Sequence, residues 1–133
     1  MALVNQVNSA FIAGQRRFRE LLESRGPLLS LSKVAYLINA AESEIMIAVV
    51  SRRILAAQLD GELQFPSAQF GLGLSNVFQI CQELPLGTSD KDILLFFLSS
   101  LDGGAPPIEL IHDPEKVPLL LARARSYLIQ GEV

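Results

Sequence analysis

Apolar residues recur every three or four positions through most of the chain, a spacing that predicts a mainly α-helical protein. The first such segment runs from Asn5 to Ser24 and ends at Gly26-Pro27, a pair that terminates helices. One region, residues 54–66, instead alternates short apolar and polar positions, as β-strands do. We expect a small helical protein in which a helix-turn-helix is followed by one β-hairpin and then by a C-terminal helical domain.

The hairpin is predicted from its turn. Asp60-Gly61 lies between the two alternating segments, and a two-residue type I′ turn favours this pair because both central residues need a positive φ. Pro66 then ends the second strand, since proline cannot donate to a strand ladder. The sequence therefore predicts a short, self-contained wing over residues 54–66.

Two short helices precede this hairpin. Ser32 is expected to cap the first helix, and Asn39 suits the left-handed position that closes it. A second helix is predicted over about Glu42 to Ser51, with Ile45 inward. This segment resembles the helix-turn-helix and wing of excisionase-like and MerR-like modules at the following positions: Ser32, Ala35, Asn39, Ile45, Leu55 and Asp60-Gly61.

The second helix lacks the side chains that read DNA. Met46, Ile47 and Val50 lie where a recognition helix would present polar groups, and base readout needs hydrogen-bonding side chains there. Ala41 cannot cap the helix with its side chain. We therefore interpret the outer face as one that packs against protein, with Arg52 and Arg53 as the expected phosphate contacts.

The first helix carries one stripe of apolar or small residues, at Val4, Val7, Phe11, Gly14, Phe18 and Leu21. Such a stripe suits either a paired helix in a dimer or a helix lying on its own domain. Combined with the second helix of the helix-turn-helix, it gives a predicted oligomer interface consisting of Val7, Phe11, Phe18, Met46, Ile47 and Val50. On the other face, Arg16 and Arg17 are candidates for contact with phosphate or with an acidic protein, or belong to a solvated face.

Charge is divided unevenly along the 133 residues. Residues 1–53 hold seven basic and four acidic residues, a net +3, whereas residues 54–133 hold four basic and ten acidic residues, a net −6. This asymmetry suits two surfaces with different partners, or two halves that attract one another within an oligomer, although ordinary scatter of surface charge would also produce it. The lone Cys81 excludes an internal disulfide and favours a cytoplasmic setting, and neither a secretory signal nor a membrane-length apolar run is present.

Beyond the hairpin every predicted element is helical. Ser75 is expected to cap a helix that ends before Pro85. Ser89 and Asp92 have the spacing of a capping box in front of an apolar helix, Ile93 to Leu98, which we expect at the centre of the core. A glycine turn and a short helix starting at Pro107 follow. Asp113-Pro114 is expected to open the last helix, with an irregular first turn and a regular helix that begins at Pro118.

No catalytic or metal-binding set can be assembled from the sequence. Cys81 falls on the apolar stripe of its helix, where a thiol is buried and inert. His112 and Asp113 are neighbours in sequence, which prevents the acid from orienting the base. One histidine and one cysteine cannot supply the usual ligands of zinc, and Gly71-x-Gly73 lacks the third glycine of a phosphate loop. We expect neither enzyme activity nor a cofactor.

Three blocks of the second half, taken in order, resemble the toxin-binding domain of Xre/MbcA/ParS-type antitoxins. They are Phe65-Pro66-x-x-Gln69-Phe70, Phe97-Leu98 and Leu101-x-Gly103-Gly104-x-x-Pro107-Ile108-Glu109-Leu110. Phe97 stands where members of that family often have Trp. The resemblance covers about half the chain and implies a toxin-binding-like domain in residues 67–133. Together with the segments above, the chain is expected to have three parts, the other two being an N-terminal amphipathic helix in residues 1–29 and a helix-turn-helix module with its hairpin in residues 30–66.

The resemblance implies a partner, namely a RES-domain toxin that consumes NAD and whose active site the antitoxin blocks. It also implies homo-oligomers and repression of the protein's own operon. The residues that it places at or near the toxin are Gly103, Gly104, Pro107, Glu109, Arg123 and Arg125. For each of them a structural role, such as shaping a turn or capping a helix, is the competing interpretation. A DNA-binding regulator and a self-assembling scaffold remain the alternative functions.

Overall fold

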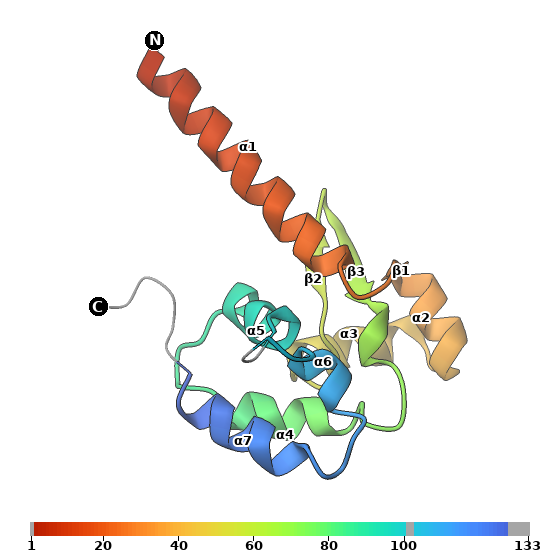
Figure 1. The fold of residues 1–133 in the computed structure, drawn as a ribbon. Helices are drawn as coiled ribbons and strands as arrows, with labels where there is room; N and C mark the ends of the chain where they lie inside the picture. Colours follow the sequence, from red (N-terminus) through yellow and green to blue (C-terminus); the bar gives the residue numbers. More distant parts are fainter. Residues whose placement is uncertain (1, 101–102, 128–133) are drawn as a thin grey trace.

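The protein is mainly α-helical, with one small antiparallel sheet, as the sequence predicts (Figure 1). The computed structural model describes the backbone of residues 2–100 and 103–127 and the side chains of residues 13–100 and 103–127. Its elements are, in order, α1 (Ala2–Glu23), β1 (Leu28–Ser30), α2 (Leu31–Ile38), α3 (Glu42–Val50), β2 (Ala57–Leu59), β3 (Glu62–Pro66), a 3-10 turn η1 (Ser67–Gln69), α4 (Asn76–Glu83), α5 (Asp90–Leu98), α6 (Pro107–Leu110) and α7 (Val117–Arg125).

Helices α2 and α3 form the predicted pair, with one correction. Asn39 closes α2 in the left-handed region, at φ 54°, as expected. The cap is Ser30 rather than Ser32: the Ser30 hydroxyl accepts a hydrogen bond from the Lys33 amide at 3.2 Å. Ser30 is also the last residue of β1, so the chain turns directly from strand to helix there. Ala41 begins α3 without a side-chain cap.

The sheet has three strands rather than two, in the order β1-β3-β2. Asp60 and Gly61 have φ values of 52° and 80°, which confirms the predicted turn between β2 and β3. The unpredicted strand, β1, pairs antiparallel with β3 and aligns Leu29 with Phe65. Strand β3 is therefore central, and β2 lies at one edge.

The sheet separates two hydrophobic cores. Leu29, Leu63 and Phe65 share one face and pack with Val34 and Ile45 of α2 and α3. The opposite face directs Leu28, Ala57 and Leu59 into a larger core made with α4 to α7 and the end of α1. Each face of a small sheet thus serves a different set of helices.

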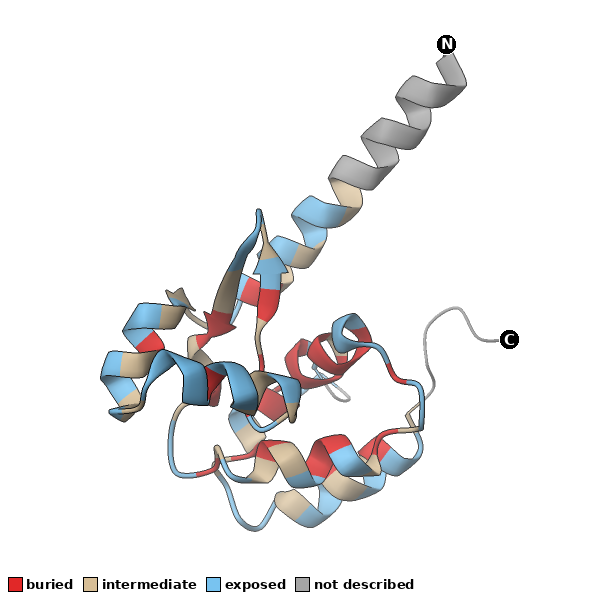
Figure 2. Ribbon diagram, turned by 180° about the vertical axis from the view of Figure 1, so that it is seen from behind, coloured by how far each residue is buried: buried red, intermediate tan, exposed pale blue. Residues whose placement is uncertain are grey.

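Helix α5 is the centre of the larger core, as predicted, and is almost entirely buried (Figure 2). Its cap is the predicted one, because the Ser89 hydroxyl accepts a hydrogen bond from the Asp92 amide at 3.1 Å. Ser75 begins α4 but makes no side-chain cap.

Asp113-Pro114 does not open the last helix, whose regular turns begin at Val117, next to the expected regular start at Pro118. The Asp113 carboxylate instead accepts a hydrogen bond from the Glu115 amide at 3.0 Å and so holds a local turn. Pro118 is tolerated only in the first helical turn, which places the helix start just before it. The regular helix is accordingly short.

Candidate partner-binding surfaces

The outer face of α3 is exposed and apolar. Met46 and Ile47 lie four and three residues before Val50, and the three side chains are 46%, 68% and 84% exposed. Helix α2 adds Tyr36 and Leu37, at 83% and 51%, which the sequence analysis did not single out. Five of the eight large hydrophobic residues exposed in the described part of the chain are therefore on these two helices. Such a concentration is typical of a protein-binding surface.

The other residues of the predicted oligomer interface belong to α1. The side chains of Val7 and Phe11 lie outside the described residues. Phe18 is half-buried against the larger core, and the Lys91 ammonium lies 5.3 Å from its ring centre. Phe18 thus already packs within its own chain, and the described residues of the predicted oligomer interface that are exposed are those of α3.

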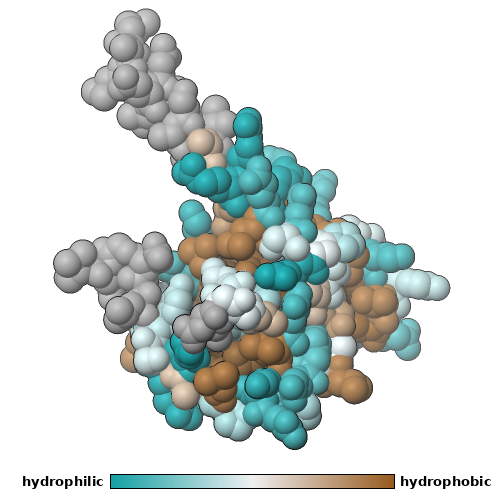
Figure 3. Space-filling view, viewed as in Figure 1, coloured by the Kyte–Doolittle hydropathy of each residue, from teal (hydrophilic) through white to brown (hydrophobic). Residues whose placement is uncertain are grey.

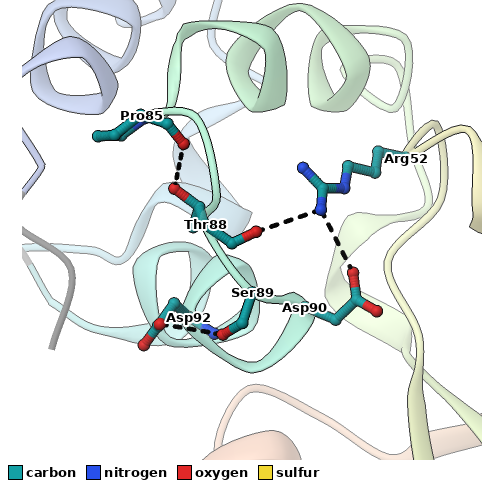
Figure 4. Close-up of polar contacts among 6 residues, drawn as sticks. All are labelled: Arg52, Pro85, Thr88, Ser89, Asp90 and Asp92. Carbon is teal, nitrogen blue, oxygen red and sulfur yellow. Dashed lines mark hydrogen bonds and ion pairs between the residues drawn. The ribbon is translucent and has the colours of Figure 1, made fainter. Parts of the chain in front are cut away.

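The two arginines expected to contact phosphate face the C-terminal half. Arg52 follows α3 in the left-handed region, at φ 62°, and its Nη2 donates to the Thr88 carbonyl oxygen at 3.2 Å (Figure 4). The same nitrogen lies 3.7 Å from a carboxylate oxygen of Asp90, at the start of α5. The Arg53 guanidinium lies 5.3 Å from the ring centre of Phe78 on α4. These contacts attach the end of α3 to the larger core.

The glycine turn and α6 form part of the surface predicted to contact a toxin. Gly103 and Gly104 are exposed, and Gly103 has a φ of 77°, which explains why glycine is used there. Pro107 is buried at the first turn of α6, so it shapes this surface from beneath. Glu109 is exposed and lies 3.8 Å from an Arg25 guanidinium nitrogen.

Helix α7 supplies the predicted basic side chains and packs beside α4 (Figure 1). Arg125 is exposed and its Nε donates to a carboxylate oxygen of Glu83 at 3.0 Å. Arg123, two residues earlier, is half-buried. Because α6 contacts both α5 and α7, the glycine turn and the two arginines are carried by elements of one packed unit.

Gln69 belongs to the first block of the sequence pattern and is completely buried. Its side-chain oxygen accepts a hydrogen bond from the Leu55 amide at 2.6 Å, while its nitrogen donates to the carbonyl oxygens of Leu55 at 2.7 Å and Pro66 at 3.0 Å. The amide thereby pairs with Leu55 as a neighbouring strand would. Sequence reasoning identified Gln69 as part of a motif but did not predict this structural role.

His112 serves as a backbone clamp. Its Nδ1 accepts a hydrogen bond from the Gly73 amide at 2.9 Å, and its Nε2 lies 2.8 Å from the Ala68 carbonyl oxygen. A carbonyl can only accept, so Nε2 carries the proton and donates it. The Asn76 side-chain amide also donates to the Ile111 carbonyl oxygen at 2.9 Å. His112 therefore holds α6 against the loop after η1.

The glycines of Gly71-x-Gly73 allow the segment around His112 to approach closely. A Cβ at Gly73 would stand 2.0 Å from the Ile111 carbonyl oxygen, and one at Gly71 would stand 2.9 Å from the His112 ring. Ordinary contacts between such atoms are longer than 3 Å. This pair is thus explained by packing.

Cys81 lies in the larger core at 5% exposure. Burial raises the pKa of its thiol to about 12, an effect that Arg52 opposes and Asp90 reinforces. The reactive form of cysteine is the thiolate, which is scarce at neutral pH for a thiol with such a pKa. Cys81 therefore has the environment of a packing residue.

Two further searches of the described residues gave no site. No three side chains of the His, Cys, Asp or Glu type gather there in a way that could hold a metal ion. Among the helices described, none combines the length and the apolar character needed to cross a lipid bilayer.

Comparison of the chain with models of protein families, with curated proteins and with solved structures found no significant match. Function must therefore be argued from the residues and their arrangement.

Proposed function

We propose that this protein is an antitoxin-like protein that binds and neutralises a RES-domain, NAD-consuming toxin. The observation that carries the proposal is the joint packing of the three sequence blocks. Gln69 ties the first block to the chain before β2, η1 contacts α6, and α5 carries the fully buried Phe97 next to α6. The three blocks thus belong to one packed unit, and the glycine turn lies on the surface of that unit.

The toxin contact is assigned to the turn at Gly103 and Gly104 together with Arg125 on α7. An exposed glycine turn lets a partner approach the backbone closely, and an arginine can pair with carboxylates or occupy a phosphate site in a nucleotide-binding cleft. Glu83, which holds Arg125 at 3.0 Å, is half-exposed, so this pair is screened by water and is easily exchanged for a partner's carboxylate.

The decisive experiment is co-expression with the neighbouring open reading frame that encodes the toxin, followed by measurement of cellular NAD. We expect the wild-type chain to restore NAD and to co-purify with the enzyme. Gly104→Arg with Arg125→Glu should weaken neutralisation at least about tenfold, because bulk and reversed charge then oppose the contact. Glu62→Lys, an exposed charge reversal on β3, is the control and should behave as wild type. Unchanged neutralisation by the double variant would exclude this surface.

Assembly is assigned to the exposed face of α3. Met46→Glu with Ile47→Glu should convert an oligomer into monomers, because burying two carboxylates in an interface is costly whereas solvated ones are tolerated. Light scattering after size-exclusion chromatography measures the change. The matched control, Gln79→Glu with Gln82→Glu on the exposed side of α4, adds the same charge elsewhere. An oligomer that survives the α3 variant would remove this role for α3.

A DNA-binding regulator is the second candidate, favoured by the order of α2, turn, α3 and the β2–β3 hairpin. Two features weigh against it: Glu42 and Glu44 place negative charge in the first turn of α3, and Arg52 and Arg53 contact the C-terminal half. DNA binding would show as retardation of the protein's own promoter fragment with a steep dependence on salt.

A further inference from the structure

A groove lies between α1, the edge strand β2 and the start of α5. Its volume is about 570 Å³, within the range of roughly 300 to 1,000 Å³ that ligand pockets occupy. Figure 3 shows hydrophobic surface gathered below the C-terminal part of α1, on this side of the molecule. The groove is separate from both the α3 face and the glycine turn. Its lining includes Arg16, Phe18, Arg19, Gln58, Leu59 and Lys91.

The edge of β2 offers the groove a backbone hydrogen-bonding pair. Leu59 and Glu62 flank the two-residue turn and therefore exchange their hydrogen bonds with each other. The alternation of an antiparallel ladder then turns the N–H and C=O of Gln58 away from β3, toward the free edge. An extended segment laid beside β2 can pair with these two groups, as in strand addition to a sheet edge.

The groove has an apolar floor and a basic rim. Phe18 and Leu59 are half-buried and pack on the larger core, so they form a surface that an apolar side chain can cover. Of the charged side chains in the lining, three are basic and one, Asp60, is acidic. Asp60 is engaged by Arg19 at 3.2 Å. Arg16 and Lys91 are exposed, so the rim of the groove presents a net positive charge to an occupant.

We infer that this groove binds an extended, acidic segment of a partner protein by adding it as a strand beside β2. Acidic residues of such a segment meet Arg16 and Lys91 at the rim, and its apolar residues cover Phe18 and Leu59. A nucleic acid is disfavoured as the occupant, because the floor offers one half-buried aromatic ring and an edge strand rather than a row of stacking rings.

The test uses fluorescein-labelled octapeptide pools in which acidic residues alternate with Val, Ile, Leu and Phe. The matched pools carry Lys and Arg at the acidic positions. We expect saturable binding of the acidic pool and binding of the basic pool weaker by at least about tenfold, measured by anisotropy. Amide shifts in NMR spectra of the full chain should map to Gln58, Leu59, Arg16 and Lys91. Absence of binding by the acidic pool, or shifts confined to other elements, would overturn the inference.

Two variants separate strand addition from simple charge attraction. Arg16→Glu with Lys91→Glu should abolish binding of the acidic pool, whereas Lys116→Glu, an exposed reversal outside the groove, should not. Gln58→Pro removes only an N–H that points away from β3, so the sheet is kept while binding falls at least about fivefold. Thermal melts of each variant verify the fold. Full binding by Gln58→Pro, or stronger binding of an oligo(dT) strand than of the acidic pool, would refute the proposed mode.

Discussion

Replacement of Gln69 by methionine is expected to lower the free energy of unfolding by about 3–5 kcal/mol. Methionine has a similar length and fills the space, but it can pair with neither the N–H nor the C=O of Leu55. Each buried backbone group left without a partner costs about 1–3 kcal/mol. The total is a large part of the 5–15 kcal/mol that stabilises a typical domain. Urea unfolding followed by circular dichroism measures it.

Two comparisons make the Gln69 result specific. Gln79→Met, on the exposed side of α4, should change stability by less than about 0.5 kcal/mol. Gln69→Glu should be at least as damaging as methionine, because a carboxylate cannot donate to Leu55 or Pro66 and its charge would be buried. A Gln69→Met protein as stable as wild type would show that the Leu55 pairing is dispensable.

Replacement of Gly73 by alanine is expected to cost more than about 3 kcal/mol, or to prevent folding altogether. The added Cβ would stand 2.0 Å from the Ile111 carbonyl oxygen, and backbone cannot move aside as a flexible side chain can. Relief of the clash would separate α6 from the loop after η1 and break the bond between the Gly73 amide and His112. The soluble yield and the melting temperature report the effect.

Gly14→Ala provides the opposite control, since a Cβ there meets nothing within 4 Å and the residue lies inside α1. Alanine should stabilise the helix by up to about 1 kcal/mol. The pair of variants tests whether contact, rather than loss of glycine as such, decides the outcome. Equal melting temperatures for the Gly73→Ala protein and wild type would contradict the close approach described for Ile111.

Local chemistry was sufficient to predict most of the fold. The turn at Asp60 and Gly61, the left-handed Asn39 and the Ser89 cap of α5 each depend on residues close together in sequence, and the structure contains all three. Strand β1 could not be predicted, because three residues carry no periodicity and their pairing partner lies about 36 positions later. Because β1 ends at Ser30, directly before α2, the cap of α2 is Ser30 and not the predicted Ser32.

The candidate surfaces were predictable to a smaller degree. The exposed apolar face of α3 follows from the sequence because apolar residues occupy both sides of a short helix, and only one side can face the core. Tyr36 and Leu37 were missed because apolar residues in a short helix normally indicate a core. The positions of Gln69 and His112 depend on contacts with residues 14 and 39 positions away, for which the chain provides no local signal.

Because the two faces of the sheet pack into different cores, the register of the β2–β3 hairpin decides which core each of its side chains enters. A slip of one residue between β2 and β3 would turn one of the two strands over, so either Ala57 and Leu59 would leave the larger core or Leu63 and Phe65 would leave the smaller one. The fit of β2 to β3, and with it the filling of one core or the other, is therefore set at Asp60 and Gly61, an exposed tip that belongs to neither core.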